Sequence, residues 1–258
     1  MKLSKLRNTS FHKWFGSDQK LNALIEGFNS HAFLANPPIA NIYQYLTDYV
    51  TLASEEVLNK NSSGIKVLDW GTGKGHVSYL LKNFGFKEVV SCDIEDVRQD
   101  STFGQEHPII DKLNIKVVPL KHDWILPFED ESFDVVVSYG VLEHVPNDLE
   151  SLKEINRILK SGGLLFCFHL PRKLGYVHFF ARLLGDNYHD RLYNRKSIKS
   201  HLNKSNFEIL DLWERTILPK NKFNFIANNI AEKIDLALVK FTPFSLLSTN
   251  IEFLAQKK

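Results

Sequence analysis

The stretch VLDWGTGKGHVSYLL, residues 67–81, constrains the fold of this chain more than any other. It begins with an apolar run typical of a β-strand and ends with apolar residues spaced as on one face of a helix. Between them lie three glycines at alternate positions, which accept positive φ angles and leave room for a ligand near the backbone. Because the first amides of the helix point toward such a ligand, the stretch predicts a strand–turn–helix unit with a binding site at the turn.

Three kinds of ligand can be compared for this glycine turn. A phosphate-binding loop requires Gly-X4-Gly-Lys-Ser/Thr, but Leu68 stands where the first glycine belongs and Gly75 follows Lys74. A dinucleotide fingerprint requires Gly-X-Gly-X-X-Gly, but His76 occupies the last position and Asp69 would repel a pyrophosphate. A positively charged nucleoside cofactor suits Asp69, because a carboxylate binds an ammonium group through charge-assisted hydrogen bonds. A tight βα connection without any ligand remains open as an alternative.

The composition is that of a globular protein with one large domain or two small ones. The chain has 258 residues, of which 43% are hydrophobic and 24% charged. Its formal net charge of +2 argues against a dedicated nucleic-acid-binding protein. We find no apolar run long enough to span a membrane and no secretory signal. Cys92 and Cys167 lie in apolar runs, so we expect reduced, buried thiols in a cytoplasmic protein.

Strand-like and helical patterns alternate along the chain. Strands are expected over residues 65–68, 87–93, 115–118, 133–139, 164–170, 207–218 and 251–255. Helices are expected over residues 42–58, 77–84, 148–160, 195–205 and 223–241. This alternation predicts an α/β fold, a parallel sheet with helices on both faces.

Polar side chains follow four of the expected strands: Asp69, Asp93, Asp123 and Tyr139. Ligands of such sheets bind outside the carboxyl ends of the strands, so these side chains should lie around one site. Asp93 stands twenty residues after Gly73, where an acid can accept both ribose hydroxyls of a nucleoside. A helix N-cap is the other interpretation of Asp93.

The segments VLDWGTGKG, VVSCD, HDW with LPFEDESFDVVVSYGVLEHV, and LKEINRILKSGGLL carry a family resemblance. On them, residues 65–170 resemble the class I S-adenosylmethionine-dependent methyltransferases, in particular the type 11 group with the ubiquinone- and menaquinone-biosynthesis enzymes. The resemblance implies a Rossmann-like, doubly wound seven-stranded sheet, mostly parallel, with an antiparallel last strand. It also implies S-adenosyl-L-methionine as cofactor.

The resemblance further implies a set of cofactor-binding residues: Asp69, Gly71, Thr72, Gly73, Gly75, Asp93, Ile94, Asp123, Trp124 and Tyr139. In this set Asp69 and the glycine turn hold the methionine portion. Asp93 takes the ribose hydroxyls and Ile94 lies against the adenine, whose edge is flanked by Asp123 and Trp124. Tyr139 lies near the sulfonium end.

Candidate catalytic residues follow the fourth strand. If the acceptor is a hydroxyl, a base helps to remove its proton, and His144 is the best-placed histidine. Tyr139 is a second catalytic candidate, with His169 and His189 behind it. Some relatives use a metal bound by Glu-X-X-Glu-His, but Gly140 occupies the first of these positions, so we expect no metal.

The rest of the chain is expected to bind the methyl acceptor. We predict an N-terminal helical cap over residues 1–60 and a methyltransferase domain over 61–258, with insertions at about 171–194 and 220–245. Residues 1–40 and 171–194 are rich in Arg, His, Trp and Tyr, which suit an acidic, aromatic or sugar-like small molecule. A helix over 220–245 either packs on the domain or contacts a membrane surface.

The chain is therefore predicted to methylate an oxygen or nitrogen of a small molecule. The alternatives are a non-catalytic S-adenosylmethionine-binding module, or a methyltransferase for a lipid-linked or saccharide acceptor at a membrane surface. A nicotinamide-dependent oxidoreductase is disfavoured by Asp69 and His76. The sequence leaves the identity of the acceptor and the oligomeric state open.

Overall fold

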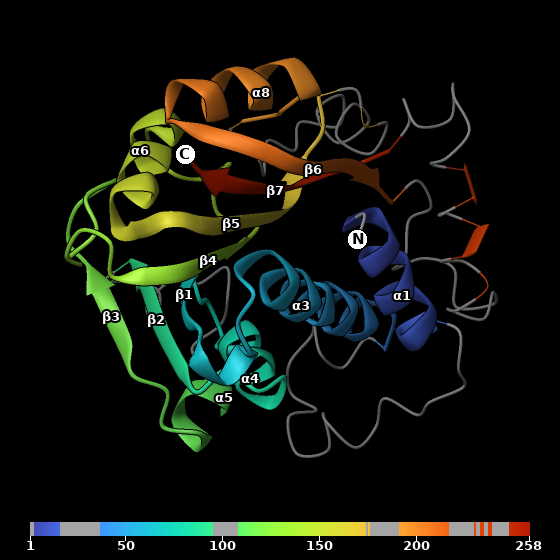
Figure 1. The fold of residues 1–258 in the computed structure, drawn as a ribbon, viewed down its shortest axis with the longest axis horizontal. Coiled ribbons are helices and arrows are strands. Elements are labelled where there is room, and N and C mark those ends of the chain that lie inside the picture. Colours follow the sequence, from blue (N-terminus) through green and yellow to red (C-terminus); the bar gives the residue numbers. More distant parts are fainter. Residues whose placement is uncertain are drawn as a thin grey trace.

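The computed structural model describes residues 3–15, 37–94, 108–173, 175, 191–216 and 248–258, together with a few positions between 230 and 238. At its centre lies one seven-stranded sheet with the order β3-β2-β1-β4-β5-β7-β6 (Figure 1). The strands are β1 (Lys66–Trp70), β2 (Glu88–Ile94), β3 (Val117–Leu120), β4 (Phe133–Tyr139), β5 (Leu159–Pro171), β6 (Phe207–Arg215) and β7 (Asn250–Lys257).

The direction of the strands confirms the predicted doubly wound sheet. Strands β1 to β5 pair in parallel, in the order that brings β1 between β2 and β4. Only β7, the last strand, runs antiparallel to both of its neighbours, β5 and β6. The carboxyl ends of β1, β2, β4 and β5 therefore meet at one edge of the sheet, where ligands of this architecture bind.

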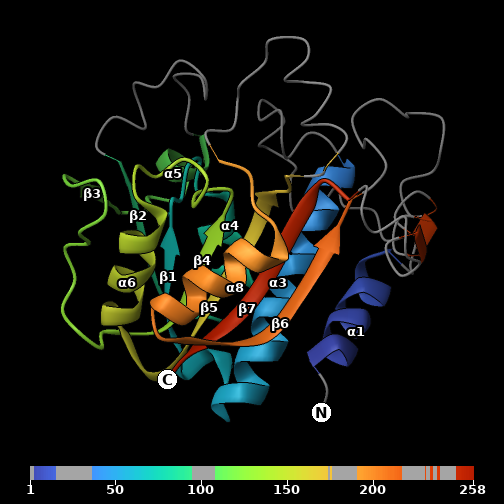
Figure 2. The ribbon, with the colours of Figure 1, turned by 90° about the horizontal axis from the view of Figure 1, so that it is seen from above.

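Helices cover both faces of the sheet (Figure 2). They are α1 (Leu3–Phe15), α3 (Pro37–Leu58), α4 (His76–Asn83), α5 (Pro108–Lys112), α6 (Asp148–Ile158) and α8 (Arg195–Lys204), with a 3-10 turn η1 at Ser62–Gly64. Helices α6 and α8 lie on one side, whereas α1, α3 and α4 lie on the other.

Neighbouring residues of the central strands point to opposite faces of the sheet, which explains why helices cover both faces. In β1, Val67 joins the core under α1, α3 and α4, whereas Leu68 joins the core under α6 and α8. Every residue of β4 is buried, which accounts for its continuous apolar sequence. A strand with two buried faces cannot show the apolar–polar alternation of a half-exposed strand.

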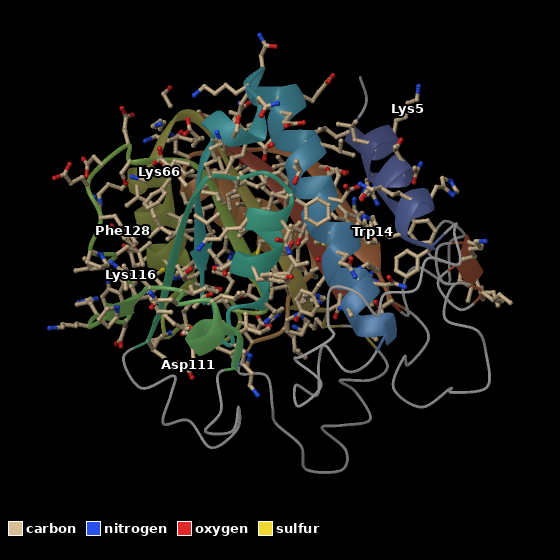
Figure 3. All side chains as sticks on the ribbon, turned by 90° about the horizontal axis from the view of Figure 1, so that it is seen from below. Lys5, Trp14, Lys66, Asp111, Lys116 and Phe128 are labelled. Carbon is tan, nitrogen blue, oxygen red and sulfur yellow. The ribbon has the colours of Figure 1, made fainter. Side chains whose placement is uncertain are left out.

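The N-terminal helices share a core with the sheet. Tyr45, Leu46 and Tyr49 of α3 pack in one cluster with residues of β1, β4 and β5. Trp14 of α1 contacts Phe84 after α4, with their ring centroids 5.8 Å apart (Figure 3). Helix α3 begins at Pro37, earlier than expected from periodicity, because proline is favoured in the first turn of a helix.

Strand β5 differs from its predicted bounds. It begins at Leu159, although the strand was expected over residues 164–170 and the preceding helix over residues 148–160. Helix α6 ends instead at Ile158, and Gly162, with φ +73°, lies within the strand. Leu159 pairs with Phe133 of β4, which explains the earlier start of the strand, and the carbonyl of Gly162 accepts a hydrogen bond from Gln256 Nε2 of β7.

Parts of the two predicted insertions lie outside the described residues. The first insertion is described only at residues 171–173, 175 and 191–194, and His189 lies outside. The second is described only at isolated positions between 230 and 238. Across all described residues, no helix combines the length and apolarity needed for a membrane span.

Candidate functional site

The glycine turn lies between β1 and α4, and its three glycines serve different purposes. All three have positive φ angles: +76° at Gly71, +50° at Gly73 and +84° at Gly75. A Cβ on Gly71 would lie 2.3 Å from Val141 Cγ2, and one on Gly75 would lie 2.8 Å from Ile110 Cγ1. A Cβ on Gly73 would meet no atom within 4 Å. Packing therefore requires the outer two glycines, and only Gly73 faces open space that a ligand could use.

Asp69 lies near the end of β1, just before this turn, and is buried, with 1% exposure. Its Oδ2 accepts hydrogen bonds from Thr72 Oγ1 at 2.8 Å and from Ser78 Oγ at 2.6 Å. Burial raises the pKa of Asp69 to about 6, although both hydroxyl bonds act in the opposite direction. Among the described residues no Lys, Arg or His forms an ion pair with it. A buried acid without a cation suits a positively charged ligand group.

Asp93 near the end of β2 is joined to the turn. Its Oδ2 accepts a hydrogen bond from the Gly73 backbone N at 2.6 Å, and its Oδ1 accepts one from the Ile94 backbone N at 2.8 Å. Each oxygen of a carboxylate can accept more than one hydrogen bond, which is the chemistry needed to bind two neighbouring hydroxyls. Ile94 beside it is 58% exposed, an apolar surface at the place where the flat face of a nucleobase is expected.

Asp123 and Trp124 lie in an exposed turn after β3, the strand beside β2. His122 Nδ1 accepts hydrogen bonds from the backbone N of Trp124 and Ile125, which shapes this turn. The Trp124 ring packs edge-on against His122, with centroids 4.8 Å apart. Because β3 pairs with β2, with Ile94 opposite Leu120, the turn is one strand away from Ile94.

Tyr139 ends β4 and is buried in an aromatic cluster of Tyr43, His76, Tyr139 and His169. The Tyr139 ring stacks on Tyr43 with centroids 5.6 Å apart, and Tyr43 also contacts His76 at 4.5 Å and His169 at 5.2 Å. The hydroxyls of Tyr139 and Thr47 share a hydrogen bond of 3.2 Å. Burial raises the pKa of Tyr139 well above its ordinary value, so its hydroxyl stays protonated. The cluster borders the glycine turn, because His76 directly follows Gly75.

His144 lies in the turn between β4 and α6, where its backbone N donates to the carbonyl of Val141. Its side chain is 37% exposed, and Nε2 lies 3.9 Å from Oε1 of Glu143. Glu143 itself is buried, and burial, with a smaller effect of nearby Glu252, raises its pKa to about 8. Glu143 was not predicted from the sequence, because only burial distinguishes it from an ordinary surface acid.

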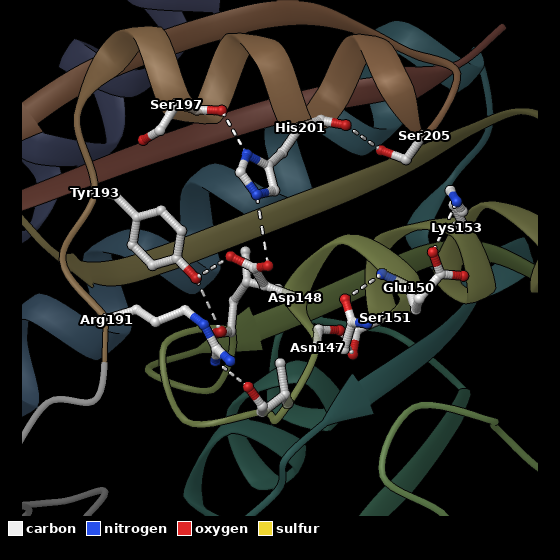
Figure 4. Close-up of polar contacts among 12 residues, drawn as sticks. Asn147, Asp148, Glu150, Ser151, Lys153, Arg191, Tyr193, Ser197, His201 and Ser205 are labelled. Carbon is white, nitrogen blue, oxygen red and sulfur yellow. Dashed lines mark hydrogen bonds and ion pairs between the residues drawn. The ribbon is translucent and has the colours of Figure 1, made fainter.

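The turn between β4 and α6 is held in place by hydrogen bonds from the residues just before α8 (Figure 4). Tyr193 Oη donates to the carbonyl of Leu142 and to Asp148 Oδ2, each at 3.0 Å. The Arg191 guanidinium donates to the carbonyls of Val145 and Pro146. These contacts hold the turn that carries His144 on both sides. No local pattern predicts them, because the partners are more than forty residues apart.

The residues of the site fit the implied cofactor. The glycine turn, Asp69 and Asp93 lie together, as the strand ends predicted. They provide a buried acid at Asp69 and an open backbone position at Gly73, and Ile94 provides an exposed apolar side chain next to Asp93. Within the described part of the chain, no group of three His, Cys, Asp or Glu side chains could hold a metal ion.

Comparisons with known proteins agree with this geometry. Residues 68–167 match the family described as a methyltransferase domain. The chain is 30% identical over 139 residues to the sarcosine/dimethylglycine N-methyltransferase of Aphanothece halophytica, covering 53% of this chain and 49% of that protein. It is 32% identical over 143 residues to the demethylmenaquinone methyltransferase of Staphylococcus aureus (strain MRSA252), covering 50% and 56%. The chain thus spans about half the length of these curated relatives.

A solved structure shares the fold. The crystal structure of a SAM-dependent methyltransferase from Archaeoglobus fulgidus superposes with a TM-score of 0.54 and 17% identity, covering 82% of this chain and 94% of that one. At this identity the likeness concerns the fold alone. The fold and the matched domain are those expected from the sequence.

Proposed function

We propose that this chain methylates a small-molecule acceptor at oxygen or nitrogen. Support comes from the match of residues 68–167 to the methyltransferase-domain family and from the fold shared with the protein of Archaeoglobus fulgidus. The observation that carries the proposal is Asp69, a buried acid without a cationic side-chain partner among the described residues, next to the open position at Gly73. A carboxylate in such surroundings gains free energy when a ligand ammonium group arrives.

In this proposal each predicted residue has one task. Asp69 and Thr72 hold the ammonium end, and the open backbone at Gly73 allows the ligand to approach. Asp93 accepts the ribose hydroxyls with the lone pairs left by its backbone bonds. The base lies on Ile94, flanked by the turn of Asp123 and Trp124. When bound, S-adenosylmethionine supplies an activated methyl group.

The chain itself aligns the acceptor and excludes water. Tyr139 is one of the two predicted catalytic residues, and its raised pKa and its bond to Thr47 favour an orienting hydroxyl over a base. His144 is the other, and its exposed side chain is accessible to an acceptor. We assign His144 the task of accepting a proton when the acceptor is a hydroxyl.

The names of the relatives supply acceptor classes to try first. One relative is named for sarcosine and dimethylglycine, and another for demethylmenaquinone. A small amine with a carboxylate and a hydroxylated aromatic ring are therefore the first candidates. We propose a cytoplasmic location, which is supported by two buried free cysteines, Cys92 and Cys167.

Calorimetry tests the cofactor part of the proposal. S-adenosylmethionine and S-adenosylhomocysteine should both bind, and Asp69→Asn should weaken binding about tenfold to a hundredfold, since a charged hydrogen bond is lost. Binding should also weaken below about pH 6, where Asp69 is protonated. Glu88→Gln, at the exposed amino end of β2, is the matched control and should bind like the wild type.

Two results would separate the alternatives. If neither compound binds at millimolar concentration, the proposal is ruled out. Binding without transfer of a labelled methyl group to sarcosine, to a naphthoquinol, or to lipid-linked or saccharide acceptors on vesicles indicates a non-catalytic binding module. Transfer only to the vesicle-bound acceptors favours the membrane-surface alternative.

A further inference from the structure

His169 has an unusual backbone conformation at the carboxyl end of β5. Its φ angle is +64°, in a region that few non-glycine residues enter. The pairing of β5 with β7 shifts register between Cys167 and Leu170, so His169 lies in a bulge. Such bulges re-aim a side chain and are common next to active sites. The strain is maintained from outside, because the backbone N of His169 donates to Glu252 Oε2 at 2.8 Å.

The hydrogen bonds of the His169 ring decide which nitrogen carries the proton. Arg215 Nη2 lies 2.9 Å from Nδ1, and a guanidinium can only donate, so Nδ1 is the acceptor. Arg215 is itself held by a 2.7 Å ion pair between its Nε and Oε1 of the buried Glu252. Burial, then Arg215, then His76 lower the pKa of His169 well below its ordinary value. The ring is therefore neutral, with its proton on Nε2.

The Nε2–H donor is buried and has no hydrogen-bond partner among the described residues. Such a group costs free energy unless something else accepts its hydrogen bond. A strained backbone and an unsatisfied donor thus occur at the same residue. Two unfavourable features at one position are typical of residues that are kept for a ligand.

The His169 ring lies in the aromatic cluster that contains Tyr139, the residue predicted to lie near the sulfonium end of the cofactor. The ring contacts Tyr43 at 5.2 Å and Tyr139 at 5.9 Å, within the aromatic cluster. The Gly140 backbone N, directly after Tyr139, donates to the carbonyl of Phe168, so the ends of β4 and β5 are side by side. His169 therefore lies at the same edge of the sheet as Asp69 and the glycine turn, two strands away from them. We assign this part of the edge to the acceptor.

We propose that Nε2–H of His169 donates a hydrogen bond to an oxygen of the methyl acceptor, and so selects acceptors with a hydroxyl, carbonyl or carboxylate oxygen close to the reacting atom. The proposal rests on the function proposed above and adds the acceptor class to it. Arg215 and Glu252 are positioning residues, since they hold the ring and its tautomer.

This arrangement also excludes two other roles for His169. The ring cannot serve as a general base, because Nδ1 already accepts a bond and Nε2 already carries its proton. It cannot recognise a quaternary ammonium group, which offers no hydrogen-bond acceptor. A cationic ligand would leave the donor unsatisfied.

Two substitutions separate the functions of the two ring nitrogens. His169→Asn keeps an oxygen near the Nδ1 position for Arg215 and tolerates a positive φ angle, but removes the distal donor. His169→Gln keeps an N–H donor near the position of Nε2 and loses the acceptor at the position of Nδ1. His12→Asn, on the exposed surface of α1, is the matched control.

The test uses the whole chain, labelled with ¹⁵N-histidine and saturated with S-adenosylhomocysteine. Catechol, benzoate, 1,4-dihydroxynaphthalene and tetramethylammonium are titrated in turn while the Nε2–H resonance of His169 is followed. We expect at least one oxygen-bearing probe to shift this resonance, and tetramethylammonium to leave it unchanged. The affinity for that probe should fall about threefold to tenfold in His169→Asn and should largely recover in His169→Gln.

The outcomes distinguish this proposal from the proposed function. Normal binding of S-adenosylhomocysteine, with equal probe affinity in wild type and His169→Asn, overturns the role of His169 alone. So does the absence of a shift with all three oxygen-bearing probes. Failure of S-adenosylhomocysteine to bind overturns the proposed function instead. An unchanged thermal midpoint in both His169 variants, as in His12→Asn, shows that altered folding does not cause the effect.

Discussion

The edge of the sheet that carries the site has two halves, and these are held together by different kinds of contact. At the ends of β1 and β2, the contacts join residues close in sequence: Asp69 with Thr72 and Ser78, and Asp93 with Gly73. At the ends of β4 and β5 they join distant segments. Tyr139 bonds with Thr47, 92 residues away, and His169 bonds with Arg215 and Glu252, 46 and 83 residues away.

The two halves also differ in how their charges are balanced. Asp69 has hydroxyl donors but no cation among the described residues, whereas Glu252 is neutralised by Arg215 within the fold. In our proposal, the ammonium group of the cofactor provides the positive charge that the first half lacks. The second half is a preformed scaffold, so the removal of one partner of its buried ion pair should appear first in stability.

The largest effect is expected from Arg215→Met. The substitution leaves Glu252, with 0% exposure, as an uncompensated buried charge. We expect a loss of about 3–5 kcal/mol in the free energy of unfolding, measured by urea denaturation. Lys153→Met is the control, since its pair with Glu150 lies at the surface, with side chains 48% and 38% exposed, and should cost about 1 kcal/mol or less. Equal losses in the two variants would contradict the difference between the halves.

The next largest effect is a difference in stability between substitutions at two glycines of the turn. Gly71→Ala brings a Cβ to 2.3 Å from Val141 at φ +76°, and should cost about 3 kcal/mol of stability. Gly73→Ala meets no atom within 4 Å and should cost only about 1 kcal/mol, from its positive φ angle. Its affinity for S-adenosylhomocysteine should nevertheless fall, because the new methyl group fills the approach to the backbone. A Gly73→Ala variant that binds normally would place the ligand elsewhere.

The smallest effect concerns the pH dependence of stability. Glu143 has its pKa raised from 4.5 to about 8, so between these values the folded protein binds more protons than the unfolded chain. Stability should therefore decrease as the pH rises through 8, by about 1–2 kcal/mol between pH 7 and pH 9. Glu143→Gln should remove most of this slope in urea denaturation. Glu150→Gln, on the neighbouring helix α6, should keep it.

The cofactor half of the site was largely predictable from the sequence. Asp69, the glycine turn and Asp93 belong to one β1–α4–β2 unit, and their spacing follows from the lengths of its elements. The reasons for the glycines were not predictable. The side chains that exclude a Cβ at Gly71 and Gly75 are Val141 and Ile110, which come from segments beyond β2.

The half at the ends of β4 and β5, to which we assign the acceptor, was predictable only in part. The positions of Tyr139 and His144 after β4 were expected, because strand ends are visible in the apolar pattern. The buried state of Glu143, the Arg215–Glu252 pair and the stacking of Tyr43 on Tyr139 were not. Each depends on which strands become neighbours, and the sequence pattern does not specify which side chains then meet.

The sequence by itself thus determined the alternation of strands and helices, the turn at Gly71 to Gly75 and the acids at the strand ends, because local periodicity and glycine geometry are properties of short segments. The tertiary structure alone decided which buried acids are neutralised within the fold. It inserted β7 between β5 and β6 and so brought Glu252 and Arg215 to His169. The charge and tautomer of a buried side chain depend on such distant neighbours, because a buried ionisable group responds to whatever packs against it.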